Sequence, residues 1–228
     1  MSSAKIRVII TGSTGMVGEG VLHECLNSTD VEAVLIINRK SARTIHPKLT
    51  EIIHPDFADL KLIESKLTGY DTCFFCLGIS SVGMKKEAYY KTTYLLTMHM
   101  AETLSRLNPG SNFCYVSGAG TSNAQPEAVN SQSNWSEVKG KTEHDLRMLP
   151  FKAAYAFRPG FIKPIPGLKN ASKFYIYINW LFPLVRAIYP AGFCTLHELG
   201  VAMIRVVTTN FPKRVIEGKD IIRLARGQ

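Results

Sequence analysis

Residues 6–27 read IRVIITGSTGMVGEGVLHECLN, and this stretch decides the fold. The β-branched run Ile6–Thr11 is typical of a buried strand, and the apolar spacing over Met16–Asn27 predicts a helix. Between them lie glycines at positions 12, 15 and 18. A tight turn from a strand into a helix directs backbone N–H groups at whatever lies before the helix, so the stretch predicts a phosphate-binding turn.

The spacing T-G-x-x-G-x-x-G is typical of turns that bind a dinucleotide. Gly12 permits the tight turn, Gly15 lets the backbone approach a pyrophosphate, and Gly18 lets the helix pack on the strand. A purely structural tight turn is the alternative, and the strand-turn-helix context favours the nucleotide. We expect the cofactor to contact the whole turn: Gly12, Ser13, Thr14, Gly15, Met16, Val17 and Gly18.

The rest of the chain repeats the alternation of strands and helices. Further strands are predicted at Ala33–Asn38, Glu51–His54, Thr72–Leu77, Phe113–Ser117 and Ala153–Phe157, and further helices at Ala58–Leu67, Lys85–Leu107, Trp135–Leu149 and Leu196–Thr208. Because parallel neighbours need a crossover connection, this order predicts an α/β fold, a Rossmann-type doubly wound parallel sheet in a single domain. We expect residues 1–165 to form its core and residues 166–228 a small lobe on the substrate side.

Composition fits one soluble globular domain and excludes a disordered chain: 228 residues, 46% hydrophobic, net charge +9. Five cysteines do not suit a disulfide framework, and no cluster has metal-ligand spacing, so we expect no metal. Lys5 and Arg7 precede only a short apolar stretch, which predicts no signal peptide. The apolar segment Phe174–Tyr189 is too short to span a membrane. We therefore expect a cytoplasmic protein.

The end of the second strand bears on which dinucleotide binds. NAD sites place an acidic residue there, about 20 residues beyond the glycines, to take the ribose hydroxyls. This chain has Asn38, followed by Arg39 and Lys40, and we expect all three to contact the cofactor. The planar guanidinium of Arg39 can bind a 2′-phosphate, so NADP is favoured over NAD; a solvated basic turn is the alternative.

Two later strand ends complete the predicted cofactor site. Asp56 and Phe57 follow the third strand and are expected near the adenine. Cys76, Leu77 and Gly78 end the fourth strand, where the backbone would pass under the cofactor.

Five motifs together resemble the atypical short-chain dehydrogenase/reductases, including the NAD-dependent epimerase/dehydratase-like and NmrA-like proteins. They are the glycine turn, L-G at 77–78, V-S-G-A-G at 116–120, V-K-G-K-T-E at 138–143 and F-R-P-G at 157–160. The resemblance implies that Ser117 and Lys139 are catalytic, that Lys139 also binds the nicotinamide ribose, and that Pro159 and Gly160 lie beside the nicotinamide. A solvated helix lysine, a turn-forming serine and a strand-ending proline are the plain alternatives.

The family's catalytic tyrosine position is occupied by Trp135, and no Y-x-x-x-K occurs anywhere in the chain. An indole N–H does not titrate near neutral pH, so Trp135 cannot transfer the proton as a phenol does. Either another group carries the proton, or the protein binds the cofactor without turnover. The candidate groups are Lys139 itself, Ser131, Ser133, Tyr89, Tyr90 and Tyr94.

Two functions remain open on this basis. The first is an NADP-dependent oxidoreductase or epimerase-like enzyme acting on a small carbonyl, alcohol or nucleotide-linked sugar. The second is a non-catalytic NADP(H)-binding regulator that acts through a protein partner. The basic stretch 139–173, with eight Lys or Arg against two acidic residues, favours an anionic substrate. We expect no nucleic acid, because no recognition motif is present. The aromatic Phe174–Tyr189 could roof the pocket, form a homodimer contact, rest on a membrane surface or be buried against the sheet.

Overall fold

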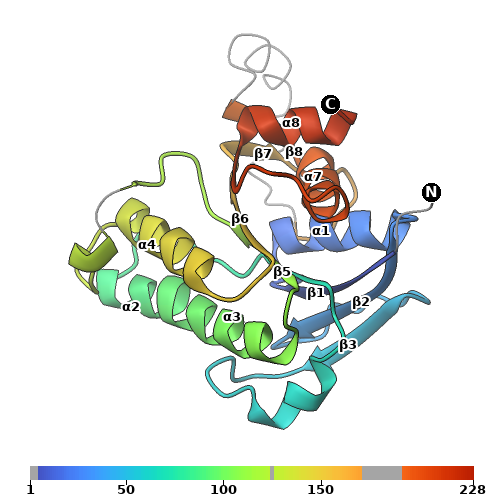
Figure 1. The fold of residues 1–228 in the computed structure, drawn as a ribbon, viewed down its shortest axis with the longest axis horizontal. Coiled ribbons are helices and arrows are strands. Elements are labelled where there is room, and N and C mark those ends of the chain that lie inside the picture. The colour runs from blue at the N-terminus through green and yellow to red at the C-terminus, as the bar shows by residue number, and fades with distance from the viewer. Residues whose placement is uncertain (1–4, 124–125, 171–191) are drawn as a thin grey trace.

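The computed structural model describes residues 5–123, 126–170 and 192–228. They form a seven-stranded, all-parallel sheet in the order β3-β2-β1-β4-β5-β6-β9, with helices on both faces (Figure 1). The predicted doubly wound α/β fold is confirmed. Its strands are β1 Ile6–Thr11, β2 Val31–Asn38, β3 Leu49–Ile53, β4 Thr72–Phe75, β5 Asn112–Val116, β6 Ala153–Arg158 and β9 Val215–Glu217.

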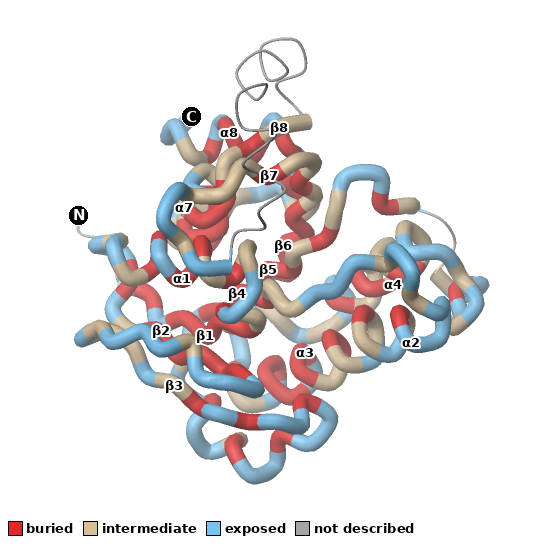
Figure 2. Tube along the Cα trace, turned by 180° about the vertical axis from the view of Figure 1, so that it is seen from behind, coloured by how far each residue is buried: buried red, intermediate tan, exposed pale blue. Residues whose placement is uncertain are grey.

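The two faces of the sheet hold two separate hydrophobic cores. In β1, Val8 and Ile10 pack in one core and Ile9 in the other, because successive side chains of a strand point to opposite faces. The first core is covered by α1 (Met16–Asn27), α7 (Leu196–Thr208) and α8 (Gly218–Arg226). The second is covered by α3 (Leu96–Leu107), α4 (Trp135–Met148) and the 3₁₀ helix Lys61–Lys66. Figure 2 shows the buried residues running through the central strands between these layers.

Several predicted elements differ from the structure by one or two residues at their ends, and two are clearly shorter than predicted. The helix expected over Ala58–Leu67 is only the 3₁₀ helix Lys61–Lys66. The carboxylates of Asp56 and Asp59 accept hydrogen bonds from the backbone two residues ahead, at 2.9 and 3.1 Å, and such local bonds compete with an α-helix. The strand expected over Thr72–Leu77 ends at Phe75, where the chain turns outward.

The long helix predicted over Lys85–Leu107 is helical throughout but is not uniform. It consists of α2 (Lys86–Tyr90), a π-helical turn over Lys91–Leu95, and α3. A π-helical turn inserts one residue and rotates the helix before it relative to the helix after it. Thr92 of this turn and Leu96 just after it thereby reach the site described below.

The chain after β6 adds elements that the sequence pattern did not reveal. The short strands β7 (Phe161–Lys163) and β8 (Phe193–Thr195) pair in parallel, and β9 extends the main sheet beside β6. Helix α8 follows β9 directly. The segment Phe174–Tyr189 lies outside the described residues, so the extent of the expected lobe stays a prediction. Within the described ranges, no helix has the length and apolarity to cross a membrane.

Candidate active site

The carboxyl ends of the strands open onto two adjoining cavities. The first cavity, of about 430 Å³, lies between the glycine turn, the end of β2 and the segment after β3. The second cavity, of about 520 Å³, lies between the end of β4, the loop after β5 and helix α4. Cys76, Gly78 and Ile79 line both, so the two cavities form one continuous trench over the strand ends. Open α/β sheets bind their ligands at this edge.

The glycine turn forms the floor of the first cavity. Gly12 has φ +74°, and a Cβ there would lie 2.7 Å from the Cys76 carbonyl oxygen and the Leu77 nitrogen. No side chain other than hydrogen therefore fits at Gly12. At Gly15 a Cβ would meet only the Gly12 carbonyl oxygen, at 3.4 Å, so the backbone at this position is open to a ligand.

The N-terminus of α1 is available to an anion. Its N-cap residue, Gly15, supplies no side-chain cap, and the Glu19 carboxylate of the first turn accepts instead from the Lys169 and Asn170 N–H groups, at 2.8 Å each. Helix α4, by contrast, begins with a capping box of Asn134 and Glu137. The first turn of α1 thus fits the pyrophosphate of a dinucleotide.

At the end of β2, one side chain points inward and the next faces the cavity. Asn38 is 2% exposed; its Oδ1 accepts from Ser13 Oγ at 3.0 Å, and its Nδ2 donates to Glu51 Oε1 at 3.0 Å. Arg39 is exposed and lines the first cavity. A cation is therefore present where the expected 2′-phosphate would lie.

Lys139 and Ser117 meet in the second cavity. The Lys139 Nζ donates to the Ser117 carbonyl oxygen at 2.9 Å and to the Val116 carbonyl oxygen at 3.5 Å. Burial lowers the pKa of Lys139 to about 8, and the nearby Glu143 carboxylate offsets part of this shift. An ammonium carries three protons, and the short bond to Ser117 uses one of them, so two remain for the weak 3.5 Å contact or for a ligand.

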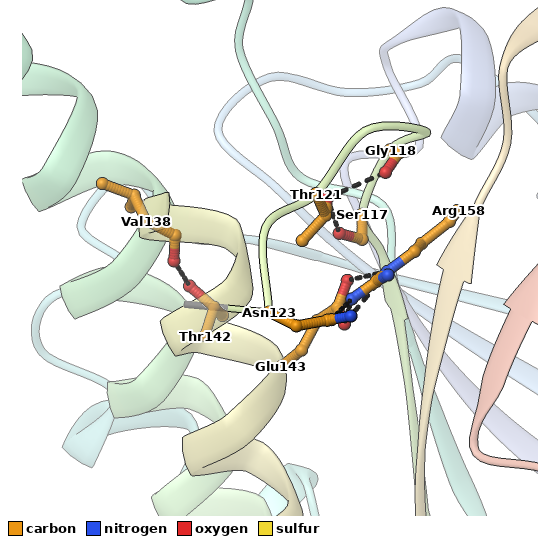
Figure 3. Close-up of polar contacts among 8 residues, drawn as sticks. All are labelled: Ser117, Gly118, Thr121, Asn123, Val138, Thr142, Glu143 and Arg158. Carbon is orange, nitrogen blue, oxygen red and sulfur yellow. Dashed lines mark hydrogen bonds and ion pairs between the residues drawn. The ribbon is translucent and has the colours of Figure 1, made fainter. Parts of the chain in front are cut away.

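The loop that carries Ser117 is held from both ends (Figure 3). Ser117 Oγ and Thr121 Oγ1 lie 3.0 Å apart, and Thr121 also donates to the Gly118 carbonyl oxygen at 2.8 Å. Arg158 of β6 donates to both carboxylate oxygens of the buried Glu143 on α4, at 2.7 to 3.2 Å, and to Asn123 Oδ1 at 2.8 Å. The bidentate pair joins β6 to α4, and the bond to Asn123 holds the loop after β5 against them.

Among the proton-carrier candidates, Lys139 and Tyr89 line the second cavity. Tyr89 is 4% exposed, and its burial raises the pKa of its phenol, with a hydrogen bond to Thr93 acting in the opposite direction. Tyr94 instead donates to Asp145 Oδ2 at 2.6 Å. The described lining of the trench does not include Ser131, Ser133, Tyr90 or Tyr94.

Trp135, which the resemblance implies stands at the family's tyrosine position, is 39% exposed and lines the second cavity. Its ring stands over the loop after β5, since a Cβ on Gly120 would lie 3.6 Å from it and one on Gly118 4.0 Å.

Most predicted site residues meet in the trench. Those in the lining are Gly12, Thr14, Gly15, Val17, Asn38, Arg39, Asp56, Phe57, Cys76, Leu77, Gly78, Ser117, Lys139, Pro159 and Gly160. Ser13, Met16, Gly18 and Lys40 are absent from the described lining of both cavities. Phe57 is mainly a core residue, 4% exposed. Contact of any of these residues with a cofactor stays a prediction.

Sequence reasoning missed several lining residues. Ile79 could have been found by continuing the Cys76–Gly78 segment by one residue. Thr92 and Leu96 could not, because their positions depend on the π-helical turn.

Comparison with known proteins places the chain in a family. The sequence profile of the NAD dependent epimerase/dehydratase family matches residues 8–141. Curated relatives include the mitochondrial protein FMP52 of Chaetomium globosum, 26% identical over 161 residues, and its namesake in Aspergillus clavatus, 28% identical over 165 residues. Each match covers 68% of this chain, and the chain spans 65% and 66% of the two relatives. Both relatives are named as mitochondrial proteins, at low identity to this chain. The cytoplasmic location expected from the sequence stays a prediction.

Among solved structures, the Bordetella bronchiseptica enzyme WbmG in complex with NAD has the same fold. The TM-score is 0.66 with 14% identity, over 98% of this chain and 78% of that one. At this identity the likeness shows the fold alone.

Proposed function

Because the chain belongs to the NAD dependent epimerase/dehydratase family, whose members bind NAD(P), we propose that it is an NADP-dependent oxidoreductase or epimerase-like enzyme. Its substrate would be a small carbonyl, alcohol or nucleotide-linked sugar. One observation carries the proposal: a single trench has an uncapped helix N-terminus and Arg39 in its first cavity, and Lys139 with Ser117 in its second.

The preference for NADP rests on the charges at the end of β2. Arg39 offers a planar pair of donors to a 2′-phosphate. The carboxylate on the neighbouring strand, Glu51, already accepts three hydrogen bonds and is not in the described lining of the trench. It is therefore not placed to take ribose hydroxyls, as the acidic residue of an NAD site does.

The chemistry that a bound dinucleotide would supply here is hydride transfer to the substrate's carbonyl carbon, or from its alcohol carbon in the reverse direction. Lys139 would hold the nicotinamide ribose and would give a proton to the carbonyl oxygen, so that hydride and proton together make the alcohol. The Lys139 pKa of about 8 suits this transfer better than the raised pKa of Tyr89. The Ser117 hydroxyl, in the same cavity, orients the substrate oxygen.

The first test is a titration of the protein with NADPH and with NADH, followed by cofactor fluorescence. We expect tighter binding of NADPH. Arg39→Ala should weaken NADPH binding by about 10- to 100-fold, the value of charge-assisted hydrogen bonds to a phosphate, and leave NADH binding almost unchanged. Arg147→Ala is the matched control, because Arg147 is an exposed arginine in the last turn of α4 and is absent from the described lining of both cavities.

Failure to bind either cofactor would contradict the proposal as a whole. Equal affinity for the two cofactors, unchanged in Arg39→Ala, would contradict only the NADP preference.

A second candidate function is a non-catalytic NADP(H)-binding regulator that contacts a partner protein. Trp135 favours the regulator: its indole cannot transfer a proton, but its exposed aromatic ring can contact another protein. Val82, 89% exposed on the segment after β4, adds apolar surface. The two candidates differ in turnover: steady oxidation of NADPH by carbonyl compounds, lost in Lys139→Met, would support the enzyme and exclude the non-catalytic regulator.

A further inference from the structure

The connection from β2 to β3 carries three exposed cations: Arg39, Lys40 and Arg43. Exposed arginine and lysine side chains of a loop sample many rotamers, and their ordering opposes ligand binding. A loop whose cations recognise a 2′-phosphate therefore binds it more tightly when the backbone that carries them is already fixed. Three hydrogen bonds from the first part of this loop end on one side chain, Glu51 of β3.

Glu51 bridges the two sides of the Arg39–Lys40 pair. On one side, Asn38 Nδ2 donates to Glu51 Oε1 at 3.0 Å. On the other, the Ala42 N–H donates to the same oxygen at 2.8 Å, and Ser41 Oγ donates to Oε2 at 2.7 Å. Both oxygens of one carboxylate thus fasten the residues immediately before and after the two cations.

The bridge extends to the glycine turn. Asn38 Oδ1 accepts from Ser13 Oγ at 3.0 Å, inside the protein. The sequence of contacts Ser13, Asn38, Glu51, Ser41 therefore connects the turn expected to hold the pyrophosphate with the loop expected to meet the 2′-phosphate.

The loop conformation held by Glu51 is not a relaxed one. Arg43 has φ +51°, in the left-handed region that residues other than glycine rarely adopt. Its N–H donates to Ser41 Oγ at 3.1 Å, the same hydroxyl that donates to Glu51. Strained backbone persists only where surrounding contacts determine it, and here those contacts lead to the carboxylate.

Glu51 is ionised in this setting. Partial burial raises its pKa, and the hydrogen bonds from Ala42, Ser41 and Asn38 outweigh that effect, so the pKa is lowered overall.

We propose that Glu51 is a positioning residue for cofactor specificity: its carboxylate fixes residues 38–43 so that Arg39 meets the 2′-phosphate of NADP. This inference rests on the proposed NADP preference and adds a residue that would not touch the cofactor. The positioning role and a simple charge argument predict opposite effects on NADPH binding when the Glu51 charge is removed. Removing a negative charge near a phosphate should tighten NADPH binding by attraction alone, whereas loss of the positioning contacts should weaken it.

The test compares NADPH and NADH affinities, by calorimetric titration, in the wild type, Glu51→Gln and Glu51→Asp. Glutamine removes the charge at nearly the same shape, and aspartate keeps the charge but shortens the reach to Ser41 and Ala42. We expect the ratio of NADPH to NADH affinity to fall about tenfold in both, with NADH affinity unchanged, since a charge-assisted contact has roughly that value. Glu32→Gln is the charge-matched control, on an exposed residue near the opposite end of β2.

An unchanged ratio in Glu51→Gln, or tighter NADPH binding, would overturn the inference. If Arg39→Ala lowers the ratio and neither Glu51 variant does, the proposed NADP preference stands and the positioning role fails. A wild type without NADPH preference would overturn both. Should the Glu51 variants not fold, Ser41→Ala removes one of the three donors alone, and it must lower the same ratio for the inference to hold.

Discussion

At the scale of single residues, the proposed chemistry of the trench depends on Lys139. Its ammonium is held by two main-chain carbonyl oxygens and is largely removed from water, which lowers its pKa to about 8. Asn38 and Arg39 divide their roles in a similar way: one side chain is used inside the fold and the next is left for a ligand.

Lys139 should give the protein a characteristic pH dependence of stability. Because its pKa is lowered in the folded state, the folded chain releases this proton near pH 8 and the unfolded chain near 10.5. Between these values the unfolded state binds more protons, so the contribution of Lys139 to the unfolding free energy rises with pH, by at most about 1.4 kcal/mol per pH unit.

Urea unfolding at several pH values, in the wild type and in Lys139→Met, measures this contribution as the difference between the two proteins. The same difference for Lys61→Met, an exposed lysine, serves as the control. A wild-type minus Lys139→Met difference that does not change between pH 8 and 10 would contradict the assigned burial of the amine.

At the scale of elements, the glycine turn and the segment after β4 depend on each other. Gly12 has room for hydrogen only, and the atoms that exclude a larger side chain are the backbone of Cys76 and Leu77. Gly78, two residues later, has open space at the Cβ position and lines both cavities. The same substitution at these two glycines should therefore have different effects.

Gly12→Ala should lower the unfolding free energy by about 1–3 kcal/mol, because it combines a left-handed φ with a backbone clash. Gly78→Ala should leave stability within about 0.5 kcal/mol and weaken NADPH binding, because its methyl group projects into the trench. Denaturant unfolding and cofactor titration of the two variants separate these effects. Equal losses of stability in the Gly12 and Gly78 variants would contradict the open space at the Gly78 Cβ position.

The elements that sequence analysis located best are those with local signals. The bounds of β1, α1 and α7 coincide with their predictions, because a glycine turn or an amphipathic period marks them. Strand β9 has three residues, too few for any period, and the π-helical turn has no sequence signature. Neither could be predicted, since packing against distant elements defines both.

The same distinction applies to the site. The glycine turn, Arg39 and Lys139 were identified from neighbours in sequence. Glu51 was predicted only as part of a strand, because its bridge to Ser41 and Ala42 exists only after β3 has paired with β2.

At the scale of the whole molecule, α1 and α7 join regions separated by about 180 residues. Their approach is close: a Cβ on Gly20 would lie 2.1 Å from the Leu196 side chain, and one on Gly200 would lie 2.6 Å from Glu24. Residues from 192 onward are therefore packed on the helix that begins at the glycine turn, and α8 packs in the same core.

Gly20→Ala should destabilise the protein by about 1–3 kcal/mol through overpacking against Leu196. Leu196→Ala removes the obstructing side chain at a cost of its own, and the double variant should lose less stability than the sum of the two single variants. Unfolding free energies of the four proteins form the test cycle. Strict additivity would mean that α1 and α7 do not make this contact in solution.

The packing of α7 on α1, with α8 in the same core, also has a consequence for biosynthesis. The described residues that line the trench lie between positions 12 and 162, so the ribosome completes them before it adds α7, β9 or α8. Until then the apolar faces of β1 and α1 lack their cover, and a nascent chain with exposed apolar surface is prone to aggregation.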